Sequence, residues 1–154
     1  MNMKTWLVVS AATLFAVAVG PRDASAQNFP GIQAHADVPS LAACLSASQS
    51  ALYNNGGDGC SGYQYATMPL MGEDGGDQSL TANVYTPDNL SDIECIWVSN
   101  DPTDLYASET GWASPPALGQ SSISFTLDVY NPGSSFLQCK LNPSARLNSV
   151  VWTM

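Results

Sequence analysis

The feature that most constrains the fold is a series of short segments in which apolar and polar residues alternate. The clearest is 122–130, where every second residue is large and apolar. Such alternation is typical of a strand with one buried face. Segments of the same kind occur at 63–68, 80–85, 93–98 and 137–141, and stretches rich in Gly, Asn or Asp separate several of them. The pattern predicts a mainly β fold, a single antiparallel β-sandwich (Greek-key or jelly-roll-like) from about residue 40 to the end.

The segment before these strands has a different pattern. Residues 27–37 show no periodicity and are expected to form an irregular arm. A short helix is predicted after them, because Asp37 is a suitable cap and Pro39 suits a first turn. The apolar residues at helical spacing are Leu41, Cys44, Leu45 and Leu52. The sandwich is therefore expected to begin with a short helical or irregular segment.

Two parts of the chain have similar sequences. Residues 81–87 and 126–132 are identical at four of seven positions, and both end in proline. Cys95 follows the first at nearly the same distance as Cys139 follows the second. We interpret the similarity as two related hairpins, each with a strand, a proline turn and a cysteine-bearing strand.

Residues 1–26 have the layout of an export signal. A lysine lies near the start, 6–20 are mostly apolar, and an Ala-Ser-Ala sequence ends at Ala26. The apolar stretch is shorter than the roughly 20 residues needed to span a bilayer. Gln27, rather than a lipid-accepting cysteine, follows the expected cut. We predict a cleaved signal peptide (1–26), one disulfide-containing domain (27–154), no stable membrane anchor, and a secreted or periplasmic location after cleavage near Ala26.

All four cysteines, Cys44, Cys60, Cys95 and Cys139, lie beyond this leader. An even number in an exported chain favours two disulfides. Three connectivities are open on sequence alone. We favour Cys44–Cys60 with Cys95–Cys139, because the first closes a short loop and the second joins similar strands. A zinc site is disfavoured, since there is no Cys-x-x-Cys pair and His35 is the only histidine.

The charge balance excludes two kinds of partner. Cleavage after Ala26 leaves two basic residues, Lys140 and Arg146, against twelve acidic ones. So few cations cannot neutralise a run of phosphates, which excludes nucleic acid. The same deficit argues against docking on anionic lipid.

Two acidic turns are candidate calcium sites. Glycine-rich stretches hold Asp58 in one turn and Glu73, Asp74 and Asp77 in another. Calcium takes six to eight oxygen ligands from carboxylates and backbone carbonyls. The EF-hand spacing is absent, and solvated turns with glycine at positive φ explain the same residues. No other cofactor is expected.

Exposed aromatic residues suggest a second kind of site. Tyr85 and Tyr130 are expected opposite the apolar faces of their strands, and Trp112 lies in a polar stretch. Rings of this kind can stack on a ligand such as a sugar, although aromatic residues more often pack in the core.

The sequence offers no catalytic constellation. A serine nucleophile beside a histidine is not expected, because His35 lies in the predicted arm and no Gly-x-Ser-x-Gly turn is present. The protein is therefore predicted to be an exported non-catalytic β-domain acting as a binding or structural module, with a glycan or an extracellular protein as candidate partner. The alternatives are a carbohydrate-binding module, with calcium as a stabilising ion, and a small carboxylate-based hydrolase.

Overall fold

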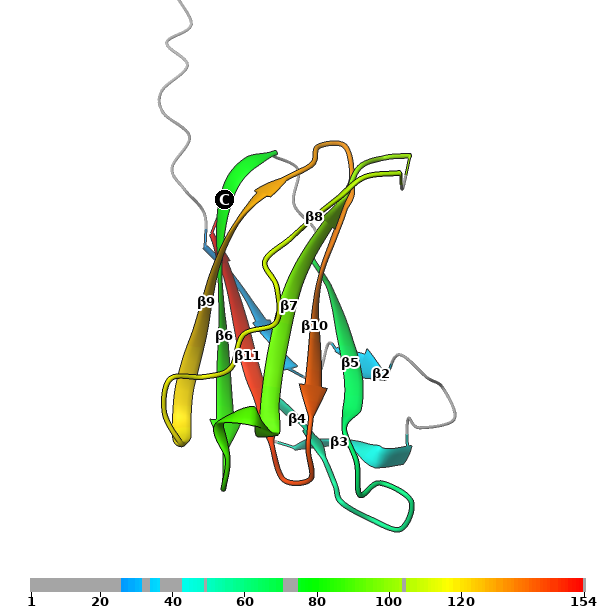
Figure 1. The fold of residues 1–154 in the computed structure, drawn as a ribbon, viewed down its shortest axis with the longest axis vertical. Helices are drawn as coiled ribbons and strands as arrows, with labels where there is room; N and C mark the ends of the chain where they lie inside the picture. Colours follow the sequence, from blue (N-terminus) through cyan, green and yellow to red (C-terminus); the bar gives the residue numbers. More distant parts are fainter. Residues whose placement is uncertain are drawn as a thin grey trace, which may run out of the picture.

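The computed structural model describes residues 26–31, 34–36, 43–48, 50–70, 75–103 and 105–153. Two antiparallel sheets pack face to face, which confirms the predicted β-sandwich (Figure 1). Within the described ranges, no helix is long and apolar enough to cross a membrane. The predicted leader lies outside these residues, except for Ala26.

One sheet has six strands and the other has five. The six-stranded sheet contains, in spatial order, β3 (Leu45–Ser48), β4 (Ala51–Asn54), β11 (Arg146–Thr153), β6 (Gly76–Thr86) and β9 (Gly119–Val129), with β1 (Ala26–Pro30) also paired to β11. The five-stranded sheet contains β2 (His35–Ala36), β5 (Gln64–Leu70), β10 (Ser134–Leu141), β7 (Ile93–Asn100) and β8 (Ala107–Glu109). A 3-10 turn, η3 (Leu90–Asp92), precedes β7.

The core lies between the sheets and follows the alternation seen in the sequence. In β9 the four apolar residues at alternate positions are buried, as predicted: Ile123, Phe125, Leu127 and Val129. Trp97 and Trp152, one from each sheet, are fully buried and pack edge to face with ring centroids 6.2 Å apart. These large rings belong to one apolar cluster that joins the two layers.

The predicted N-terminal helix is wrong over the residues that the structure describes. Leu45–Ser48 and Ala51–Asn54 form the antiparallel pair β3 and β4, joined by a turn in which Ser50 has φ 70°. Serine alternates with other residues from Leu45 onward, which suits a strand better than a helix. The part of the predicted helix at 37–42 lies outside the described residues.

The irregular N-terminal arm is also corrected. Ala26–Pro30 forms β1 along the C-terminal strand, with Gln27 opposite Trp152. Local periodicity could not show this, because the paired residues are 119 to 127 positions apart in the chain. The pairing joins the beginning of the predicted domain to its last strand.

The two similar segments are not hairpins. After each one the chain passes from the six-stranded sheet to the five-stranded sheet, so β6 pairs with β9 and β7 pairs with β10. Equivalent positions of the repeat face each other: Leu80 is opposite Phe125, and Cys95 is opposite Cys139. The repeat therefore consists of two sheet-crossing units related by an approximate two-fold axis.

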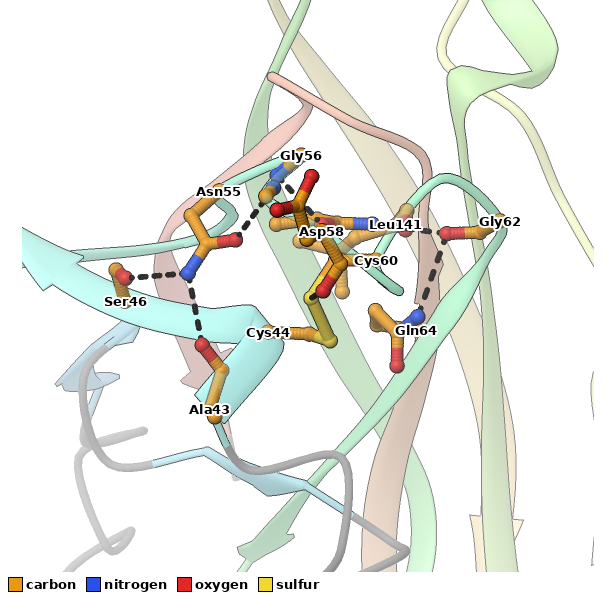
Figure 2. The surroundings of a disulfide bond; sticks show 12 residues. Ala43, Cys44, Ser46, Asn55, Gly56, Asp58, Cys60, Gly62, Gln64 and Leu141 are labelled. Carbon is orange, nitrogen blue, oxygen red and sulfur yellow. Dashed lines mark hydrogen bonds between the residues drawn. A yellow bond between two sulfur atoms is a disulfide. The ribbon is translucent and has the colours of Figure 1, made fainter.

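Both predicted disulfides are confirmed. Cys95 and Cys139 join β7 to β10 in the core, with their Cα atoms 4.1 Å apart. Cys44 and Cys60 join the start of β3 to the β4–β5 loop, with their Cα atoms 5.3 Å apart. Figure 2 shows that the Asn55 side chain ties the same two segments together, donating to the Ala43 carbonyl at 2.8 Å and the Ser46 hydroxyl at 3.2 Å.

Candidate ligand-binding site

The outer face of the five-stranded sheet carries a row of aromatic and charged side chains. In register, Lys140 on β10 lies between Tyr65 on β5 and Glu94 on β7. Their chain neighbours Cys95 and Cys139 point into the core, and successive side chains of a strand point to opposite faces. The core disulfide therefore lies beneath this row and fixes the two central strands that carry it.

Lys140 and Glu94 form an ion pair across these strands. The Lys140 Nζ lies 3.0 Å from the Glu94 Oε2, and both side chains are largely buried against the sheet. Ser114 donates from its hydroxyl to the other carboxylate oxygen of Glu94 at 3.4 Å. The pair neutralises the Lys140 charge locally, while the exposed Glu109, opposite Val98, adds a negative charge elsewhere on the same face.

Trp112, in the segment between β8 and β9, lies against this row of side chains. The next residue, Ala113, exchanges two backbone hydrogen bonds with Cys95, at 2.8 and 2.9 Å. The indole then lies beneath the Lys140 Nζ, 4.1 Å from the ring centroid, and meets Tyr65 edge to face at 6.2 Å. Cation–π and edge-to-face contacts hold a ring in one orientation. Trp112 nevertheless remains 40% exposed.

We call the group Tyr65, Glu94, Trp112 and Lys140 the Trp112 cluster. Tyr65 is 42% exposed, as is Tyr63, which directly precedes β5. The cluster offers apolar ring surface beside charged groups that still have hydrogen-bonding capacity. Such a surface suits a ligand that has an apolar face and a rim of hydroxyl groups.

The three aromatic residues predicted as a stacking site lie in separate places. Trp112 belongs to the cluster just described. Tyr85 lies on β6, on the outer face of the other sheet, and Tyr130 directly follows β9. The structure therefore does not bring Tyr85, Trp112 and Tyr130 together into one platform.

The predicted calcium residues lie in two different parts of the sandwich. Asp58 is exposed in the β4–β5 loop beside Cys60 (Figure 2), whereas Asp77 is on β6, directly opposite Asp128 on β9. Glu73 and Asp74 lie outside the described residues. In the part of the chain that is described, no three His, Cys, Asp or Glu side chains are grouped to hold a metal ion. A calcium site stays a prediction.

The loop between β7 and β8 is organised by one carboxylate. Asp101 accepts hydrogen bonds from the Thr103 hydroxyl at 2.7 Å and from the backbone N–H of Leu105 at 3.0 Å. These bonds, the Thr103 contact first, hold the pKa of Asp101 below its usual 3.8. The loop presents Leu105 and Tyr106 to solvent, away from the Trp112 cluster, and Tyr106 is 68% exposed.

Sequence reasoning did not single out Tyr65, Lys140 or Glu94 as site residues. The sequence does contain a signal that Glu94 and Lys140 lie together. If Cys95 and Cys139 face each other across antiparallel strands, then Glu94 must face Lys140. The contact with Trp112 has no such signal, because it depends on how the segment after β8 continues along the edge of β7.

The chain matches no protein-family model and no curated protein sequence. Among solved structures, it is similar to the C-terminal CBM6 of LamC, a marine laminarinase from Zobellia galactanivorans, with a TM-score of 0.52 and 10% identity over 84% of this chain and 100% of that one. A β-(1,4)-mannanase from Podospora anserina, described as GH26-CBM35, matches with a TM-score of 0.47 and 10% identity over 82% of this chain and 27% of that one. At this identity the first similarity shows a shared β-sandwich fold.

Proposed function

We propose that the protein is an exported, non-catalytic carbohydrate-binding module that binds a neutral glycan at the Trp112 cluster. The observation that carries the proposal is the exposed Trp112 indole, held in a fixed orientation by Tyr65 and by a hydrogen-bonded ion pair. An aromatic ring can pack against the C–H face of a sugar, while charged and hydroxyl groups bind its hydroxyls.

The fold supports the same conclusion. The CBM6 whose fold this chain shares is, by its description, a carbohydrate-binding module of an enzyme that acts on a polysaccharide. Fold similarity alone does not assign function, so the proposal depends on the exposed residues of this chain. Glu94 neutralises the positive charge of Lys140, so the cluster has no free cation for an acidic glycan and suits an uncharged one better.

An exported location is part of the proposal. Both disulfides are formed between the cysteines that follow the predicted leader, and disulfides persist in oxidising compartments. If cleavage follows Ala26, the mass of the mature protein recovered from the culture medium or periplasm corresponds to a chain beginning at Gln27. An intact leader on the recovered protein would contradict cleavage without affecting the binding site.

The binding experiment uses the intrinsic fluorescence of the mature domain. Of its tryptophans, Trp97 and Trp152 are fully buried, so a change in emission on adding a glycan reports on Trp112. Neutral polysaccharides, including β-1,3-glucan and β-1,4-mannan, are titrated and the positive ones are quantified by calorimetry. Trp112→Ala is expected to weaken binding by about tenfold or more, as loss of an aromatic anchor commonly does.

Tyr106→Ala is the matched control, because it removes an exposed aromatic ring from the β7–β8 loop outside the cluster. It is expected to leave glycan affinity unchanged. Equal losses in the two variants, or glycan binding that persists in Trp112→Ala, would show that the cluster is not the binding surface. Absence of binding to every neutral glycan would contradict the proposed function itself.

A further inference from the structure

The outer face of the six-stranded sheet holds the second cation of the predicted mature domain. Arg146, the first residue of β11, lies opposite Tyr53 of β4 on one side and Tyr85 of β6 on the other. Its guanidinium carbon is 5.8 Å from the first ring centroid and 5.4 Å from the second. Both distances are within cation–π range. The two rings therefore hold the guanidinium between them at the surface.

This cation differs from Lys140 in having no described carboxylate beside it. No Asp or Glu in the described ranges lies within 4.0 Å of the Arg146 guanidinium, whereas Glu94 is 3.0 Å from Lys140. Ring contacts use the π surface of the guanidinium and leave its N–H groups available as donors. In a chain of net charge −9, an exposed arginine with no described carboxylate within 4.0 Å is a local exception to the overall charge.

The described strands beside Arg146 carry no acidic side chain at this end of the sheet, although Asp88 follows Tyr85 by three residues in the turn after β6. The described acidic residues that project from the same sheet, Asp77 and Asp128, form a pair at its other end. Asp77 and Tyr85 are eight residues apart along β6, about 27 Å at the usual rise per residue. That separation exceeds the screening length at physiological salt, roughly 8 Å. An anion at Arg146 therefore experiences little repulsion from this pair.

Polar, uncharged side chains cover the strands beside Arg146. Asn83 donates to the Ser149 hydroxyl at 2.9 Å and accepts from the Ser122 hydroxyl at 2.8 Å. Asn148 reaches Gln120, the residue opposite Tyr85, at 3.1 Å. A hydroxyl- and amide-lined surface matches the hydroxyl groups of a sugar better than the apolar side chains of a peptide.

We propose that Arg146, between Tyr53 and Tyr85, is a second binding site, specific for the carboxylate of a uronic acid residue in a glycan. The planar guanidinium presents paired N–H donors that match the two oxygens of a carboxylate. The tyrosine rings fix the donor in place and supply apolar walls for the sugar ring. The glycan part of this assignment rests on the proposed function, whereas the carboxylate part rests on Arg146 and its surroundings.

The test uses methyl glucuronide as the probe and methyl glucoside as its uncharged counterpart. The nitrogen-15 NMR signal of the Arg146 side-chain Nε–H is expected to shift and saturate with the glucuronide only. Arg146→Gln is expected to weaken glucuronide binding by about tenfold or more, as loss of a charge-assisted bidentate contact does. Arg146→Lys keeps the charge but loses the paired donors, so most of the affinity should still be lost. Unchanged melting temperatures would establish that both variants remain folded.

Leu105→Glu lowers the net charge by the same single unit in the exposed β7–β8 loop, outside both faces, and is the control for net charge. It should leave the shift of the Arg146 Nε–H intact. If glucuronide affinity is the same in Arg146→Gln as in the wild type, or falls only in Trp112→Ala, the second site does not exist. Glucuronide binding at Arg146 without any neutral glycan at Trp112 would support this site and contradict the proposed function. A Gly-Glu-Gly peptide that binds Arg146 more tightly than glucuronide would overturn the glycan assignment.

Discussion

The outer faces of the two sheets each carry a cation in contact with aromatic rings, but only one of these cations is paired with a described carboxylate. On the five-stranded sheet, Lys140 lies over Trp112 and is paired with Glu94. On the six-stranded sheet, Arg146 lies between Tyr53 and Tyr85 with no described carboxylate within 4.0 Å. A cation over aromatic rings therefore contributes a neutral surface in one place and a positive one in the other.

Strand register explains the difference. β7 places Glu94 directly opposite Lys140, whereas both neighbours of β11 place a tyrosine opposite Arg146. The residue across the ladder thus decides whether a surface cation is neutralised. The net charge of the chain is strongly negative, but it does not predict the local charge around Lys140 or around Arg146. We expect the first face to select neutral glycans and the second to select a uronate.

The largest expected effect comes from the disulfide under the first face. Cys95→Ala combined with Cys139→Ala should lower the free energy of unfolding by about 4 kcal/mol, because the crosslink closes a long loop. Removal of Cys44 and Cys60, which are 16 rather than 44 residues apart, should cost about 3 kcal/mol. Urea unfolding measures both values.

The variant without the Cys95–Cys139 bond also tests whether the two faces bind their ligands independently. Loss of the Cys95–Cys139 bond loosens the strands that carry Glu94 and Lys140, so neutral-glycan binding should fall before the protein unfolds. Glucuronide binding at Arg146 should persist, since β4, β6 and β11 do not contain these cysteines. A parallel fall of both affinities in a folded sample would contradict the independence of the faces.

A smaller effect is expected when the first face is made to resemble the second. Glu94→Gln leaves Lys140 without its acidic partner, so the Trp112 cluster should gain glucuronide affinity. The Glu94–Lys140 pair is partly exposed, and a pair at the surface contributes up to about 1 kcal/mol, which limits the gain to about fivefold. Calorimetry in the Arg146→Gln background isolates this site. Unchanged affinity there would show that Glu94 does not set the charge selectivity of the face.

The smallest effect is expected at Asp101, which belongs to neither face. Asp101→Ala removes the acceptor of the Thr103, Leu105 and Tyr106 hydrogen bonds, so amide exchange should accelerate in this loop. The charged form makes these bonds and its pKa is lowered, so their contribution is present above pH 3.8 and is lost as the pH falls further. Neither ligand affinity should change in Asp101→Ala. A change would show that the loop contributes to a binding face.

Local sequence patterns predicted much of the sandwich for physical reasons. Alternation at 122–130 reports directly which residues of β9 are buried, and the similar strands around Cys95 and Cys139 indicated their pairing. Local patterns predict an irregular arm at the start of the domain, because nothing within that segment shows that β1 is stabilised by pairing with the distant β11. At 45–54, the helical spacing of the apolar residues predicts a helix, whereas the alternating serines suit the short strand pair that forms.

The candidate site was less predictable than the fold. The polar surroundings of Trp112 predict an exposed ring, but its partners depend on strand register and on the course of the segment after β8 along the edge of β7. Arg146 was used only as part of the charge balance, although it is the residue that distinguishes one face from the other. Its environment requires β4, β11 and β6 to be aligned, and no short segment of sequence contains that information.

The most direct measurement is a two-ligand titration of the mature domain followed by nitrogen-15 NMR. A neutral glycan that quenches tryptophan fluorescence should shift the Trp112 indole signal, and methyl glucuronide should shift the Arg146 Nε–H. Each ligand should bind equally well in the presence of the other, while the indole signals of the buried Trp97 and Trp152 stay in place. Competition between the two ligands, or shifts of one shared set of residues, would contradict two faces with separate specificities.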